Sequence, residues 1–105
     1  MLVTKKVNSA FIGEPDLHGW LTDRGIGQIV VVGIQTNMCV ETTSRMGGNL
    51  GYDVIVPIDA TSTFDLTGPD GEVMTAEELK RATVTNLHGG GFATVTTTEA
   101  VLAAR

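Results

Sequence analysis

Hydrophobic and polar positions alternate along this chain in blocks that predict strands and helices in turn. The apolar run over 28–34 is rich in β-branched residues, which favours a central parallel strand buried on both faces. Before it, Leu17, Trp20 and Leu21 recur at helical spacing, and Gly25 is a typical residue for the end of that helix. Alternating strands and helices predict an α/β fold in which helices cover both faces of a parallel sheet.

The rest of the chain continues the alternation. We expect the following further elements: a short strand from Leu2, a helix over 38–50 that ends at Gly51, a strand over 52–58, a surface loop over 59–74, a helix that begins with a capping box at Thr75 and ends at the glycines 89–91, a strand over 92–96 and a terminal helix over 98–104. In the helix over 38–50, Gly47 and Gly48 each cost up to about 1 kcal/mol relative to alanine. We therefore expect this helix to pack closely against a neighbouring element.

Composition and charge narrow the class of protein. The 105 residues, 42% of them apolar, predict one small globular domain. No apolar run approaches the roughly 18 residues that cross a bilayer, and the first residues lack the order of a signal peptide. The net charge of −5 argues against nucleic acid or an anionic membrane as a partner. A single cysteine cannot form an internal disulfide, so we expect a cytoplasmic location.

Cys39 is the residue with the clearest potential for chemistry. It follows the apolar strand and lies at the start of the predicted helix, where backbone N–H groups and a partial positive charge stabilise a thiolate or an oxyanion. An ordinary cysteine thiol has a pKa of about 8.5 and is only a few per cent thiolate at neutral pH, so a nucleophile needs such help. The alternative is that Cys39 is a small buried hydrophobic residue.

Other candidate residues have structural interpretations. We expect His18 on an exposed helix face, His88 near a helix C-terminus, and Trp20 in the core. Two histidines 70 residues apart, without a Cys or Asp spacing pattern, do not predict a metal site. Gly89 to Gly91 do not follow a strand and open a helix, so they do not predict a phosphate loop. We expect no metal and no cofactor.

Three segments of the chain resemble the isochorismatase-like cysteine hydrolases. The first is the run over 33–43, Gly-Ile-Gln-Thr-Asn-Met-Cys-Val-Glu-Thr-Thr, followed by Gly51-Tyr52-Asp53-Val54 and Asp59-Ala60. The second is the segment over 5–11, Lys-Lys-Val-Asn-Ser-Ala-Phe, in which Lys5 holds the place of the family's catalytic lysine. The third is the ending over 87–96. Together they span essentially the whole chain.

This resemblance implies a three-layer α-β-α fold with a six-stranded parallel sheet, as in Rossmann-like proteins. Residues 1–105 would then be a single domain of this type, truncated at its N-terminus and lacking the first two or three strands. Members of the family carry a catalytic aspartate on the opening strand, in an Asp-x-Gln setting. The six aspartates of this chain fall elsewhere in the pattern, so none of them is assigned this role.

The resemblance also implies the roles of individual residues. Cys39 would be the nucleophile and Lys5, which by itself would be interpreted as a surface lysine, would orient the acid and hold charge. The backbone N–H groups of Gln35 and Cys39 would form an oxyanion hole. A cis peptide bond would join Ile34 and Gln35.

The implied function is hydrolysis of a small amide-like C–N bond through a thioester on Cys39, with nicotinamide, carbamoyl or ureido compounds as the substrate class. The alternative is a catalytically inactive α/β module that exists as a homo-oligomer, because a half-sheet exposes an edge strand and apolar surface. A third possibility is a thiol sensor that is oxidised reversibly at Cys39. The missing aspartate strand discriminates between the enzyme and the inactive module. If another chain supplies this strand, we expect activity; if nothing supplies it, we expect Cys39 to behave as an ordinary thiol.

Overall fold

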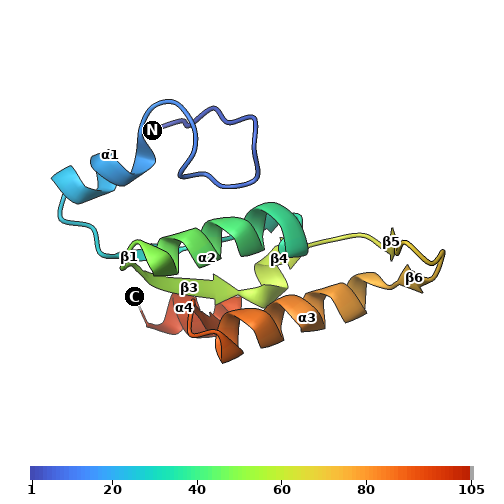
Figure 1. Cartoon of the computed structure of the whole chain (residues 1–105). Helices are drawn as coiled ribbons and strands as arrows, with labels where there is room; N and C mark the ends of the chain where they lie inside the picture. Colours follow the sequence, from blue (N-terminus) through green and yellow to red (C-terminus); the bar gives the residue numbers. More distant parts are fainter. Residues whose placement is uncertain (105) are drawn as a thin grey trace.

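Three parallel strands form the central sheet of the computed structural model, which describes residues 1–104 (Figure 1). The strands are β1 (Gln28–Val30), β3 (Asp53–Pro57) and β7 (Thr94–Thr96), in the spatial order β1-β3-β7. In the register of the sheet, Ile29 lies opposite Val54 and Val56 lies opposite Val95. The predicted α/β class with a parallel sheet is therefore confirmed.

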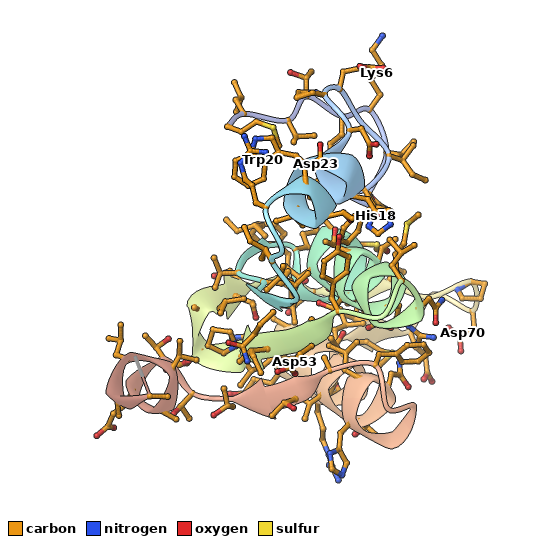
Figure 2. All side chains as sticks on the ribbon, turned by 90° about the vertical axis from the view of Figure 1, so that its left-hand side faces the viewer. Lys6, His18, Trp20, Asp23, Asp53 and Asp70 are labelled. Atoms are coloured by element: carbon orange, nitrogen blue, oxygen red, sulfur yellow. The ribbon has the colours of Figure 1, made fainter. Side chains whose placement is uncertain are left out.

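Helices cover both faces of this sheet. They are α1 (Leu17–Asp23), α2 (Glu41–Asn49), α3 (Ala76–Gly89) and α4 (Thr98–Ala103). Figure 2 shows α2 and α3 on one side of the sheet and α4 on the other. The core lies on the side of α2 and α3 and consists of Val40, Val54, Val56 and Leu87. Parallel strands need such crossover helices because each strand finishes at the opposite end of the sheet from the start of the next strand.

Local signals set the ends of α3 and α4. Thr75 accepts a hydrogen bond from the backbone N–H of Glu78 while the Glu78 side chain accepts from the backbone of Thr75, so the predicted capping box is present. At α4, Asp59 Oδ1 accepts hydrogen bonds from Thr98 N at 2.8 Å and Thr98 Oγ1 at 2.9 Å. These two bonds hold the pKa of Asp59 below its ordinary value, because they stabilise the carboxylate.

The close packing that we predicted around the two adjacent glycines of α2 is confirmed. A Cβ at Gly47 would lie 3.0 Å from Val54 Cγ2, and a Cβ at Gly48 would lie 2.6 Å from the carbonyl oxygen of Phe92. The helix can therefore approach β3 and the start of the last strand more closely than any larger residue would allow.

Short elements complete the chain. β2 (Gly33–Ile34) pairs in parallel with β4 (Thr61–Ser62), and a 3-10 turn over Ile58–Ala60 joins β3 to β4. The region predicted as a surface loop also contains an antiparallel hairpin of β5 (Leu66–Thr67) and β6 (Val73–Met74), which projects from the body of the molecule (Figure 1). Its turn places Gly71 at φ 85°, which favours glycine.

Two strand predictions were wrong. The apolar run over 28–34 is not one strand buried on both faces: it divides into β1 and β2, and Val30, Val32 and Ile34 are 48, 56 and 62% exposed. The reason is that β1 is an edge strand, and Val30 lines an open groove between the sheet and α4. At Leu2 there is no strand, and the nearby pairing is a single antiparallel bridge between Thr4 and Glu14.

Two side chains of α1 also differ from expectation. His18 is half-buried, and its Nδ1 lies 2.6 Å from the hydroxyl of Tyr52, because α1 packs its His18 side toward the residue directly before β3. Trp20 is half-buried rather than part of the core, and the guanidinium of Arg24 lies 3.9 Å from the centre of its ring. A cation over an indole face is a favourable arrangement at the surface.

Candidate active site

Cys39 lies in a π-helical segment, Thr36–Val40, between β2 and α2. The carbonyl oxygen of Gln35 accepts from the backbone N–H groups of both Met38 and Val40, at 3.2 Å each. Wide turns of this kind are frequent at functional sites. The segment follows a parallel strand at its C-terminal end, the edge of α/β sheets at which ligands commonly bind.

Side chains from the loop after β3 hold the start of this segment. Thr36 Oγ1 donates to Thr61 Oγ1 at 2.8 Å, and Thr61 Oγ1 donates to the carbonyl oxygen of Ile58 at 2.8 Å. Thr63 Oγ1 hydrogen-bonds Asn37 Oδ1 nearby. Since Thr36 and Thr61 are buried, these bonds restrict the turn that carries Cys39.

Two side chains from the N-terminal segment contact the half-buried thiol of Cys39. Lys5 Nζ lies 3.6 Å from Cys39 Sγ and also donates to the carbonyl oxygen of Val7 at 2.9 Å. Asn8 Oδ1 lies 3.6 Å from the same sulfur and accepts a hydrogen bond from the thiol. The sulfur therefore has one cationic neighbour and one neutral hydrogen-bond acceptor.

Contacts with α2 fix the N-terminal segment in this position. Thr43 Oγ1 accepts from Ala10 N at 3.0 Å and donates to the carbonyl oxygen of Asn8 at 3.5 Å. Ser9 Oγ donates to Met46 Sδ at 3.1 Å. Thr43 lies one helical turn after Cys39, so the helix that presents the thiol also holds the loop that carries its neighbours.

The structure brings the site residues of the sequence analysis together. Lys5 and Cys39 are 34 positions apart in the chain, yet their side chains are in contact. The peptide bond between Ile34 and Gln35 is cis. Gln35 Oε1 is buried and has no hydrogen-bond partner among the described residues.

Sequence reasoning missed one neighbour of the thiol, Asn8. Asn8 could have been identified from its position in the segment over 5–11, three residues after Lys5. Across residues 1–104, no carboxylate hydrogen-bonds Cys39 Sγ, and no group of three or more His, Cys, Asp or Glu side chains is arranged to hold a metal ion. No helix in this described part is long and apolar enough to cross a membrane. Among the described residues, therefore, no strong base lies beside the sulfur.

Comparison with known proteins gives consistent matches over nearly the whole chain. Residues 1–100 match the isochorismatase domain. The isochorismatase family protein YrdC of Bacillus subtilis is 36% identical over 97% of this chain and 54% of its own length. Nicotinamidase 3 of Arabidopsis thaliana is 36% identical over 85% of this chain and 39% of its own length.

A solved structure shows the same arrangement of elements. An isochorismatase-family protein from Chromobacterium violaceum superposes with a TM-score of 0.89 and 37% identity, over 97% of this chain and 52% of that one. The chain thus spans about half the length of the Bacillus subtilis relative and of this solved structure.

Proposed function

The chain belongs to the isochorismatase family, and from this premise we propose that it provides the nucleophile of a hydrolase that cleaves a small amide-like C–N bond. Cys39 is the nucleophile, and the intermediate is a thioester on its sulfur. The contact between Lys5 Nζ and Cys39 Sγ, at 3.6 Å, is the observation that most supports this proposal. It joins two separate segments that both resemble the family pattern.

The proposed reaction has two steps. In the first, Sγ forms a bond to the carbonyl carbon, and the C–N bond then breaks with its electron pair passing to nitrogen, which takes up a proton and leaves as ammonia or an amine. In the second, water attacks the thioester carbonyl, the C–S bond breaks, and the acid leaves while the thiol is restored. Neither step needs a cofactor or a metal ion.

Residues around the sulfur have complementary proposed roles. The Lys5 ammonium stabilises negative charge on Sγ, and the backbone N–H groups of Gln35 and Cys39 stabilise the oxyanion of the tetrahedral intermediate. The thiol proton needs a carboxylate base, which the family resemblance assigns to an aspartate that none of the aspartates of this chain replaces.

The proposed substrate class is that of small amide-like compounds, and one relative supports a first candidate within it. One relative is named a nicotinamidase, so nicotinamide is the first candidate, with carbamoyl and ureido compounds next. We propose that the reaction takes place in the cytoplasm, where an unpaired thiol stays reduced.

Ammonia release from nicotinamide tests the proposal. The purified chain is compared with Cys39→Ala, and with Cys39→Ser as a near-isosteric control for folding. Because none of the aspartates of this chain is assigned as the base, we expect slow ammonia release from the wild type and a fall to the uncatalysed rate in Cys39→Ala, as for loss of a catalytic nucleophile. Trapping of an acyl adduct on the wild-type chain, by intact mass, would identify the thioester.

A second candidate is an inactive module that acts as a homo-oligomer. Two observations favour it: no carboxylate within residues 1–104 hydrogen-bonds Sγ, and the apolar side chains of Val30 in β1, Ile34 in β2 and Val32 between them are left exposed. Absence of ammonia release from the whole substrate class, in a folded chain whose thiol still reacts with iodoacetamide, would contradict the enzyme and favour this module.

A further inference from the structure

Asn8 contacts the reacting sulfur directly. Its Oδ1 lies 3.6 Å from Cys39 Sγ, on a segment 31 positions earlier in the chain. Two hydrogen bonds to Thr43 on α2 place this segment: the carbonyl oxygen of Asn8 accepts at 3.5 Å, and the N–H of Ala10 donates at 3.0 Å. The Asn8 side chain is thus presented to the sulfur by its own anchored backbone.

The chemistry of a carboxamide limits what Asn8 can do. An amide oxygen accepts a hydrogen bond but is not basic enough to remove the thiol proton. A hydrogen bond accepted from S–H stabilises the neutral thiol, whereas the Lys5 ammonium at 3.6 Å from the same sulfur stabilises the thiolate. The sulfur therefore accepts a hydrogen bond from Lys5 Nζ, while its own S–H bond is donated to Asn8 Oδ1.

We propose that Asn8 is a positioning residue that accepts the hydrogen bond of the Cys39 thiol and directs its S–H bond. This inference rests on the proposed function in one respect: Cys39 is the nucleophile. A thiol whose S–H bond is held by an acceptor reacts less readily with oxidants and stray electrophiles, because the thiolate is the reactive form. Formation of the nucleophile then requires a proton acceptor that Asn8 itself cannot provide.

Alkylation of the single thiol tests this role without any substrate. The wild-type chain, Asn8→Leu and Asn8→Asp react with neutral iodoacetamide at pH 7, and intact mass follows the one cysteine. Asn8→Leu removes the acceptor, so we expect alkylation about two- to tenfold faster, the range for loss of one hydrogen bond. Asn8→Asp places a negative charge beside the sulfur, so we expect slower alkylation by a similar factor.

Asn49→Leu is the matched control, because Asn49 is exposed at the end of α2 and is replaced in the same way. Its alkylation rate should equal that of the wild type. Opposite changes in Asn8→Leu and Asn8→Asp are the signature of the proposed role, since a loss of local structure would move both rates in one direction. Circular dichroism checks that each variant is folded. If Asn8→Leu unfolds, the alkylation rate of Asn8→Asp still tests the proposal, because aspartate is nearly isosteric with asparagine.

Slower or unchanged alkylation in Asn8→Leu would overturn the proposal. The result of the alkylation experiment can be distinguished from the result of the ammonia-release experiment. Ammonia release that depends on Cys39, together with unchanged alkylation in the Asn8 variants, would retain the hydrolase and reject the role of Asn8. The reverse result would retain the role of Asn8 in a chain that is not an amide hydrolase.

Discussion

The thiol of Cys39 takes its properties from residues that are distant in the chain. Lys5 and Asn8 lie 34 and 31 positions before it, and each places one polar atom 3.6 Å from the sulfur. Lys5 is exposed, so its charge is partly screened by water, and the influence of a single exposed pair is modest. At the residue scale, the site is thus a half-buried thiol with a cation on one side and a carboxamide on the other.

Lys5→Met should change how the thiol discriminates between charged and neutral reagents. Anionic iodoacetate is attracted by the Lys5 ammonium and neutral iodoacetamide is not, so the ratio of their alkylation rates should fall by about two- to fivefold, the size expected for an exposed charge pair. The measurement is the rate of mass increase with each reagent at low ionic strength.

Lys6→Met is the control for this experiment. Lys6 is also exposed, and its side chain points away from the body of the molecule (Figure 2). The substitution removes the same charge, one residue away, without removing a contact to the sulfur. An equal fall in the ratio for both variants would show that net charge, and not the position of Lys5, sets the reactivity.

Helix α2 connects the site to the core at the scale of elements. Its first turn follows the segment that carries Cys39, Thr43 and Met46 hold the N-terminal loop, and Gly47 and Gly48 allow close contact with the strands. Packing in this region therefore determines where the thiol and its neighbours lie.

Gly48→Ala should destabilise the protein even though alanine favours helices. The added Cβ would lie 2.6 Å from the carbonyl oxygen of Phe92, a backbone atom that cannot move aside without shifting the turn between α3 and β7. We expect the free energy of unfolding to fall by about 1–3 kcal/mol, as for an overpacked core position. Urea unfolding followed by circular dichroism measures it.

Gly89→Ala provides the comparison, because Gly89 is the last residue of α3 and no atom lies within 4 Å of its added Cβ. There we expect no loss, or a gain of up to about 1 kcal/mol from helix propensity. Equal destabilisation by both substitutions would refute the packing argument for α2.

The molecule as a whole has one face of its sheet incompletely covered. Side chains of the three strands and of α4 line an open groove on this face: Gln28, Val30, Ile55, Thr94, Thr96, Ala100, Val101 and Ala104. Beyond it, Val32 and Ile34 are more than half exposed, and within residues 1–104 no strand pairs with the outer edge of β1. Neither charge nor proline protects this edge, and uncovered edges of this kind promote association.

We propose that the chain associates with itself through this face and edge. Light scattering should give a mass above the 11.1 kDa of one chain, and Val32→Lys should shift it towards the monomer, because a charge at an apolar interface must be desolvated. Val73→Lys is the matched control, since Val73 is 57% exposed on the projecting hairpin. A wild-type chain that stays at the monomer mass at every concentration would contradict self-association.

Much of this structure could be predicted from local patterns. Three features depend only on residues that are neighbours in the sequence: the capping box at Thr75, the glycines at the ends of helices, and the strand predicted over 52–58 and found over 53–57. A short stretch of sequence is therefore enough to predict each of them. The close packing of Gly47 and Gly48 was also predictable, because a glycine pair inside a helix is costly without a packing reason.

The sequence by itself determined the α/β class, the order of its main elements and the position of Cys39 between a strand and a helix, because hydrophobic periodicity and turn residues act over a few positions. Only the tertiary structure decided the contact of Asn8 with the thiol, the bond between His18 and Tyr52, and the exposure of the run over 28–34. An apolar strand has the same sequence signal at the centre and at the edge of a sheet. Its burial depends on which other segments pack against it, and that is a property of the folded chain.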